Sequence, residues 1–408
     1  MTGSEPAGSG RWGSLPRTAA AGRPEAIRVD PFETDFEIDD DIRRAWTAPA
    51  DLYEGADRFA RLREAVFARS WQFVGDTDPV RAPGHVEPLT LLPGFLDEPL
   101  LLTRDGDDTL RCLSNVCTHR GNLLVESGGR CQVLRCRYHG RRFGLDGGFL
   151  SMPEFEEAEG FPSASDDLPR LPLALWGKLA FAALDPLQSF DELAGPLRER
   201  LAWLPLDELT FEPTRSRDYL VKAHWALYVE NYLEGFHVPF VHAGLARMLD
   251  YASYATELDR WSVLQLGIAA AGEEAFDPPP SSPDHGRRVA AYYGWLFPNT
   301  MVNAYPWGIS VNVVQPLAPD RTKVLFRTYV HDPARLESGA GASLDRVERE
   351  DEAIVEAVQR GVRSRLYRRG RYSPTREQGV HHFHRLLAEA LRGGEGGDGE
   401  GAGALSGP

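Results

Sequence analysis

The chain has 408 residues and a formal net charge of −15 at pH 7, with 42% hydrophobic and 26% charged residues. These values are ordinary for a globular protein long enough for two domains, and the negative charge argues against nucleic acid or an anionic membrane as the main partner. No apolar run approaches the roughly 18 residues of a transmembrane helix, and the N-terminus lacks the apolar core of a signal peptide. Four cysteines are too few for a disulfide framework. We therefore expect a cytoplasmic protein.

The chain begins and ends in segments of biased composition. Residues 1–30 and 393–408 are rich in small residues, chiefly Gly and Ala, which predicts disordered tails. Residues 31–70 are expected to form a helical lead-in that packs on the second of two domains. Short β-favouring runs separated by Gly, Pro and Asp turns follow over residues 71–186, and they predict an all-β first domain.

Residues 187–392 predict a second domain of mixed helices and strands. A long amphipathic helix is expected from about 344 to 368. Four strand regions are expected, at 262–270, 290–305, 309–317 and 322–330. The fold class is therefore α+β, with an all-β domain followed by a mixed domain.

Two short segments of the first domain each carry a cysteine followed closely by a histidine. Cys117 precedes His119 and Cys136 precedes His139, with a glycine just after each pair. A structural zinc site usually groups its two cysteines and then its two histidines, so the interleaved order makes zinc the weaker alternative. One Cys and one His from each segment suit a two-iron cluster in which one iron takes both thiolates and the other both imidazoles. The pattern therefore indicates a Rieske-type [2Fe–2S] cluster.

A second set of metal ligands is expected in the segment HWALYVENYLEGFHVPFVH, residues 224–242. On an ideal helix His237 and His242 would lie about 140° apart, so they can share one metal only if the helix breaks. Pro239 stands between them and is the residue expected to break it. Two imidazoles and one carboxylate form the facial triad of non-haem iron sites that activate O2, because that set leaves coordination positions open.

The carboxylate of this triad is expected on the long helix near residue 350. An apolar stripe is formed there by Val347, Ile354, Val355, Val358 and Val362. Asp351 falls on that stripe, whereas Glu350 lies about 100° away. A buried acid is costly unless it is paired or bound to a metal. Asp351 is therefore the expected ligand, with Glu350 as the second candidate and an ordinary ion-paired acid as the alternative.

One region departs from the acidic average of the chain. Between Arg111 and Arg142 there are seven arginines and a single acid, Glu126. This arginine-rich segment is either an ordinary solvated face, including one that pairs with a neighbouring subunit, or a docking surface for an acidic electron carrier. The sequence leaves both interpretations open.

The cysteine–histidine motif resembles that of the Rieske non-haem iron oxygenases, and the likeness extends over roughly residues 40 to 392. By this resemblance the cluster ligands are Cys117, His119, Cys136 and His139. The resemblance also implies a Rieske domain joined to a helix-grip (START-like) catalytic domain with an antiparallel sheet. Members of the family usually assemble as head-to-tail trimers, so a homotrimer is expected.

The second motif is similar to the family pattern Asn-x2-(Asp/Glu)-x2-His-x4-His with a late carboxylate. Carried over, His237, His242 and Asp351 bind the mononuclear iron. Asn231 matches a polar residue near the iron, and Glu234 matches the carboxylate that links a ligand histidine to the cluster of a neighbouring subunit. A glutamate at this last position departs from ring-hydroxylating dioxygenases. It is similar to the branch that oxidises quaternary ammonium compounds, such as choline monooxygenase and betaine or carnitine oxygenases.

The resemblance implies a terminal oxygenase that uses O2, and electrons from NAD(P)H through a separate reductase or ferredoxin, to hydroxylate or demethylate a small organic substrate. The expected cofactors are a [2Fe–2S] Rieske cluster and a mononuclear Fe(II). No Gly-rich nucleotide fingerprint leads a strand into a helix, so this chain is not expected to bind NADH or flavin itself. An aromatic-ring cis-dihydroxylating dioxygenase and a Rieske electron-transfer protein without oxygenase activity are the alternatives.

The substrate is left open by the sequence. Candidate rings for a pocket are Tyr293, Trp295, Tyr305 and Trp307. Such rings can hold a methylammonium group by cation–π attraction, stack on an aromatic substrate, or simply pack in the core.

Overall fold

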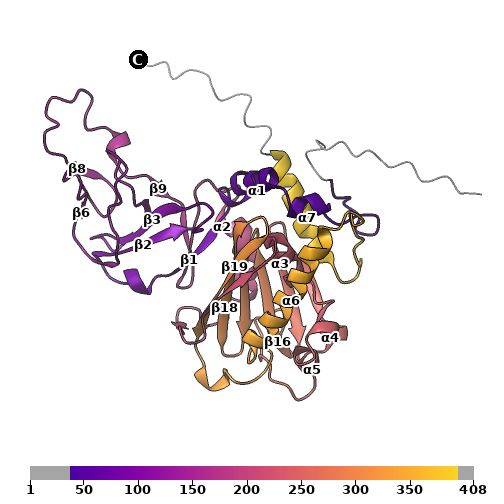
Figure 1. The fold of residues 1–408 in the computed structure, drawn as a ribbon. Helices are drawn as coiled ribbons and strands as arrows, with labels where there is room; N and C mark the ends of the chain where they lie inside the picture. The colour runs from indigo at the N-terminus through magenta and orange to yellow at the C-terminus, as the bar shows by residue number, and fades with distance from the viewer. Residues whose placement is uncertain (1–36, 394–408) are drawn as a thin grey trace, which may run out of the picture. The chain divides into compact units, whose positions relative to one another are not determined.

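The computed structural model describes residues 37–393 (Figure 1). The tails expected over 1–30 and 393–408 lie outside the described residues, apart from Gly393, which ends the last helix. No helix in the described range is long and apolar enough to cross a membrane.

The lead-in is helical from residue 50 onward. It consists of a 3-10 turn, η1 (Ala50–Tyr53), the helix α1 (Ala56–Leu62) and a π-helical turn, η2 (Arg63–Phe67). The ring of Phe67 is fully buried and meets Trp225 edge-on at 4.8 Å between ring centroids. The lead-in therefore packs against the first helix that carries site residues.

Three small antiparallel sheets make up the region expected to be all-β. Their strands are β1 (Gln72–Asp76), β2 (His85–Leu91), β3 (Glu98–Arg104), β4 (Leu110–Ser114), β5 (Gly129–Arg130), β6 (Leu134–Arg135), β7 (Arg142–Phe143), β8 (Phe149–Ser151), β9 (Arg170–Leu171), β10 (Leu173–Trp176) and β11 (Leu179–Ala182). The strand orders are β1-β11-β10, β5-β2-β3-β4-β9 and β6-β7-β8. One cysteine–histidine segment follows β4, and the other is the connection of the β6–β7 hairpin, so short strands fix both.

The second domain is built on one large antiparallel sheet. Its strands are β12 (Thr210–Phe211), β13 (Arg217–Val221), β14 (Ala255–Leu258), β15 (Ser262–Ile268), β16 (Val289–Leu296), β17 (Thr300–Tyr305), β18 (Gly308–Ala318) and β19 (Arg321–Val330). The order is β12-β19-β18-β17-β16-β15-β14, and β13 also pairs with β19. The single strand region expected at 290–305 is two strands of a hairpin, because its apolar residues continue through the turn that pairs Leu296 with Thr300.

Helices pack beside this sheet. They are α2 (Phe190–Arg200), α3 (Trp225–Tyr232), α4 (Val238–Val241), α5 (Leu245–Met248), α6 (Leu344–Val362) and α7 (Gln378–Gly393), with the shorter 3-10 turns η5 (Tyr251–Ser253) and η6 (Pro333–Arg335). The 3-10 turns η3 (Asp78–Val80) and η4 (Ala164–Asp166) belong to the first domain. Helix α3 contacts both α6 and β18 (Figure 1). The α+β fold with helices against an antiparallel sheet is thus confirmed, and the long helix ends at Val362 rather than near 368.

Helix α7 has no counterpart among the elements expected from the sequence. Its run of three histidines within four residues hides the apolar periodicity, yet Phe383 and His384 are both fully buried. The His384 ring has its Nδ1 2.6 Å from the Tyr372 hydroxyl and its Nε2 3.1 Å from a Glu230 carboxylate oxygen. A buried histidine with polar partners on both sides behaves as a core residue, which explains the missed helix.

Candidate metal centres

The two cysteine–histidine loops share one backbone shape. The carbonyl of Cys117 accepts a hydrogen bond from the Gly121 N–H at 3.0 Å, and the carbonyl of Cys136 accepts one from the Gly140 N–H at 3.1 Å. Both glycines are left-handed, with φ of 71° and 76°, a conformation that strains any residue with a Cβ. The glycine after each pair is therefore what lets both loops turn back and present their cysteine and histidine in the same way.

The four side chains of these loops gather at one place. The two thiols are each 2% exposed, and the rings of His119 and His139 lie 4.9 Å apart between centroids. The Nδ1 of His139 is buried without a hydrogen-bond partner, as expected of a metal-binding atom. Burial, and after it the charges of His139 and Arg141, lower the pKa of His119, which keeps that imidazole neutral and able to coordinate. The residues present fit a [2Fe–2S] cluster.

The arginine-rich segment divides into structural and exposed members. Arg141 is 2% exposed and lies 2.6 Å from Asp166, while Arg111 pairs with Asp105 at 2.9 Å. The exposed arginine patch consists of Arg120, Arg130, Arg135, Arg137 and Arg142. Two of the seven arginines thus hold the fold, and only the remaining five can serve a partner.

The helix that carries the second motif breaks earlier than expected. Helix α3 ends at Tyr232, and the next helix, α4, has His237 as its N-cap and His242 as its C-cap. Pro239 lies in the first turn of α4, where proline is tolerated, so the expectation that it breaks the helix is wrong. The break includes Gly235, where a Cβ would come within 2.7 Å of the Tyr254 ring. The two histidines therefore lie at the two ends of the four-residue helix α4, and His242 has already left helical geometry, with φ of −107° and ψ of 72°.

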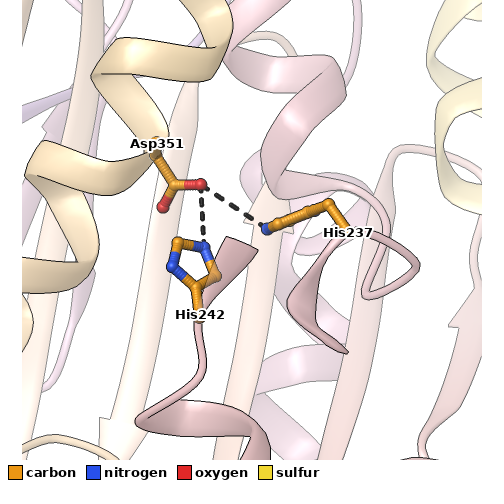
Figure 2. A group of neighbouring side chains, drawn as sticks. All are labelled: His237, His242 and Asp351. Atoms are coloured by element: carbon orange, nitrogen blue, oxygen red, sulfur yellow. Dashed lines mark hydrogen bonds and ion pairs between the residues drawn. The ribbon is translucent and has the colours of Figure 1, made fainter. Parts of the chain in front are cut away.

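Figure 2 shows His237, His242 and Asp351 converging from α6 and from the ends of α4. The Asp351 Oδ1 lies 3.0 Å from the His242 Nε2 and 3.5 Å from the His237 Nε2. One ligand atom from each of the three residues lies within 4.8 Å of the other two. Asn231 donates a hydrogen bond from Nδ2 to the same Asp351 oxygen at 2.7 Å. Two imidazoles and a carboxylate at this spacing fit the facial triad of non-haem iron.

His237 and His242 each contact a second carboxylate besides that of Asp351. Glu234 Oε1 lies 2.7 Å from the Nδ1 of His237, and Glu350 Oε2 lies 2.7 Å from the Nδ1 of His242. When Nδ1–H donates to the carboxylate, Nε2 carries the lone pair that a metal needs. Burial lowers the pKa of His242, but the hydrogen bonds and charges of Asp351 and Glu350 together raise it. Glu350 is therefore placed as an orienting group, a role that the sequence does not reveal because His242 is 108 residues away.

Some of the apolar residues used to infer the position of Asp351 on its helix are not buried. Ile354 and Val358 are 39% and 43% exposed, and the buried side chains of α6 are Glu348, Val355, Gln359 and Val362. Asp351 lies three residues after the first of these and four before the second, so it still belongs to the inner face. Because Glu348 and Gln359 are polar, the apolar pattern did not identify them as part of the inner face, but its placing of Asp351 on that face holds.

A cavity opens beside the triad, between α3, α6 and the sheet. Its lining includes all three triad residues and five tyrosines, Tyr228, Tyr232, Tyr254, Tyr293 and Tyr305. Of the four rings that the sequence offers as candidates, Tyr293 and Tyr305 line the cavity, whereas Trp295 and Trp307 are not among its lining residues and are 0% and 1% exposed.

A Rieske cluster site and a facial-triad iron site in one chain define the Rieske oxygenases, and the comparisons with known proteins agree. The family model "Rieske [2Fe-2S] domain" matches residues 70–164, and "Ring hydroxylating alpha subunit (catalytic domain)" matches residues 206–393. The chloroplastic choline monooxygenase of Arabidopsis thaliana is 31% identical over 385 residues, covering 89% of this chain and 87% of that protein. The chain belongs to the family of Rieske oxygenase alpha subunits, and it is an enzyme with a [2Fe–2S] cluster and a mononuclear iron.

Three further comparisons agree with this assignment. The carnitine monooxygenase oxygenase subunit of Escherichia coli (strain K12) is 29% identical over 369 residues, with 86% of this chain and 95% of that one covered. A solved quaternary ammonium Rieske monooxygenase superposes with a TM-score of 0.70 at 25% identity, covering 86% and 96% of the two chains. Naphthalene 1,2-dioxygenase from Rhodococcus sp. shares the fold at 18% identity, with a TM-score of 0.65 and coverage of 85% and 94%.

Proposed function

We propose that this Rieske oxygenase is a monooxygenase that hydroxylates or demethylates a quaternary ammonium compound. The observation that carries the proposal is the cavity beside the triad, whose tyrosine rings offer π faces to a methylated ammonium group. The choline and carnitine monooxygenases among its relatives support the same class of substrate. Aromatic-ring dihydroxylation is not favoured, because naphthalene dioxygenase is similar in fold alone.

We assign the ligands residue by residue. Cys117, His119, Cys136 and His139 hold the cluster, and His237, His242 and Asp351 hold the iron. The bound iron supplies O2 activation and the cluster supplies electrons, while Glu234 and Glu350 orient the two ligand imidazoles and Asn231 holds the Asp351 carboxylate.

The wider assembly is also part of the proposal. We propose a Rieske domain over 71–186 and a catalytic domain over 187–392, in a homotrimer that receives electrons from a separate reductase or ferredoxin. A solved relative is described in connection with inter-subunit electron transfer, which supports an oligomer. The cytoplasmic location expected from the sequence stays a prediction, since several relatives are chloroplastic.

The experiment that tests the proposal is a substrate panel with a surrogate reductase. Choline, carnitine, glycine betaine and naphthalene are each supplied with NADH, and O2 uptake is compared with product found by mass spectrometry. Coupled uptake and product with a quaternary ammonium compound are expected. Product from naphthalene alone would point to ring dihydroxylation, and about two rather than about three irons per chain would point to a pure electron-transfer protein.

The exposed arginine patch is expected to receive an acidic electron carrier. Arg135 and Arg137 flank Cys136, and both are exposed. Within residues 37–393, Arg137 has a single ion pair, a loose contact of 3.5 Å with the exposed Glu126. An exposed pair of this kind contributes little, so the charge is available to a partner. Because salt screens such attraction over a Debye length of about 8 Å at physiological ionic strength, the association rate should fall as salt rises.

Charge reversal tests this docking. The double variant Arg135→Glu, Arg137→Glu should slow reduction of the cluster by an acidic ferredoxin roughly 10-fold or more at low salt, and reduction by dithionite should be unchanged. Arg321→Glu, at an exposed turn of the catalytic sheet, is the matched control, and the ferredoxin should reduce its cluster at the wild-type rate. Equal rates for the double variant and the wild type would assign the patch to ordinary solvation or to a subunit contact.

A further inference from the structure

The carboxylates that line the cavity are not balanced by lysine or arginine side chains. Its lining residues, all within the described part of the chain, include the three acids Glu234, Glu348 and Asp351 but no lysine or arginine. Glu234 is held by His237, and Asp351 by Asn231 and the ligand histidines. Glu348 is the lining acid that takes no part in the metal site.

Glu348 has an oxygen that the protein leaves without a partner. The residue is 3% exposed and lies three positions before Asp351 on α6, so both side chains share the inner face of that helix. One carboxyl oxygen, Oε2, accepts a hydrogen bond from the Tyr228 hydroxyl. The other, Oε1, is buried without a hydrogen bond, and no basic group of the described residues forms an ion pair with Glu348. A buried acid left in this way is costly unless something else occupies the cavity.

The protein groups around Glu348 do not stabilise a charge on its carboxyl group. Burial raises the pKa of Glu348 to about 8; the hydrogen bond from Tyr228 lowers it, the charges of Asp351 and Glu352 raise it, and that of Arg349 lowers it. A cation placed beside Oε1 would favour the ionised carboxylate. The missing interaction is thus the one that a positively charged ligand supplies.

We propose that Glu348 is the counter-charge for the cationic head of the substrate, and that the cavity takes an organic cation without a carboxylate. This inference rests on the proposed function and narrows it. A zwitterion would bring its carboxylate into a cavity with no lysine or arginine to pair it, beside the acids Glu348 and Glu234. A cation with a neutral tail meets no such repulsion, and the rings of Tyr254 and Tyr293, stacked 6.5 Å apart between centroids, add π faces.

Calorimetric titration of the oxidised holoenzyme without O2 tests the proposal. The three probes are choline, glycine betaine, which carries a carboxylate, and 3,3-dimethylbutan-1-ol, in which a carbon replaces the ammonium nitrogen. Choline should bind the wild type at least about 10-fold more tightly than either of the others. Glu348→Gln, which keeps an acceptor for Tyr228, should weaken choline binding at least about 10-fold and leave the neutral alcohol unchanged.

The matched control is Glu352→Gln. Glu352 lies on the same helix, pairs with Arg349 at 3.1 Å and does not line the cavity, so its replacement should not weaken the binding of choline. Equal weakening of choline and the neutral alcohol by Glu348→Gln would reveal a merely structural role and overturn the inference, as would glycine betaine binding as tightly as choline. If no quaternary ammonium compound bound the wild type, the proposed function itself would be wrong.

Discussion

Asp351→Ala is expected to remove the mononuclear iron and leave the Rieske cluster intact. Asp351 lies within reach of both ligand histidines, whereas the two cysteine–histidine loops are on other strands and share no residue with the triad. Iron per chain should fall from about three to about two, while acid-labile sulfide and the visible spectrum of the cluster stay unchanged. Oxygenation of substrate should fall to background, because no other described residue completes the triad.

Glu350 supplies the control for this variant. Helix phase alone indicates that Glu350→Ala leaves iron bound, but the 2.7 Å contact with His242 refines that expectation. Loss of an orienting carboxylate typically weakens metal affinity about 10- to 100-fold. The iron site of the Glu350→Ala variant should therefore be fully occupied only at raised iron concentration. Glu350→Gln keeps an acceptor and should bind nearly normally. If the Asp351→Ala variant kept its iron and the Glu350→Gln variant lost it, Glu350 would be the ligand and Asp351 the orienting group.

Glu234→Gln is expected to abolish turnover while both metal centres stay filled. Glu234 accepts from the His237 backbone N–H at 3.0 Å and contacts the ring Nδ1 at 2.7 Å, so it holds that ligand without reaching the metal itself. Gln keeps the size of the side chain but loses the negative charge that accepts an imidazole N–H strongly. By the family resemblance, this carboxylate is also expected to meet a cluster histidine of the partner subunit, so the route between the centres should be interrupted.

Stopped-flow spectroscopy checks this expectation. The Glu234→Gln cluster should accept electrons from dithionite at the wild-type rate and then remain reduced in the presence of O2 and substrate. Glu230→Gln, four residues earlier and held by the Tyr53 hydroxyl at 2.8 Å, should reoxidise normally. Near-normal product formation by Glu234→Gln would remove Glu234 from electron transfer.

The sequence predicts those site residues that stand close together along the chain. Cys117 with His119, and Cys136 with His139, are each recognisable because one loop supplies both ligands and a glycine closes it. The hydrophobic period of a helix then adds Asp351, although Ile354 proved exposed. Local order and helix phase are short-range properties, so they can be read without a fold.

Groups that work through distant contacts could not be predicted in this way. Glu350 meets His242 across 108 residues, and Glu348 meets Tyr228 across 120. On α6 both acids look like ordinary members of a charged run, EREDE. Only the packing of α6 against α3, and against the loop that follows α3, shows which of these acids face the metal site, the substrate cavity or solvent.

Single-turnover oxygenation tests the central claim most directly. The holoenzyme is reduced with dithionite, freed of excess reductant, and mixed with O2 and the quaternary ammonium compound that binds most tightly, with no reductase present. The account predicts hydroxylated or demethylated product in an amount comparable to the amount of chain, appearing as the cluster reoxidises, and none without O2. Reoxidation of the cluster without product from any quaternary ammonium compound would contradict it.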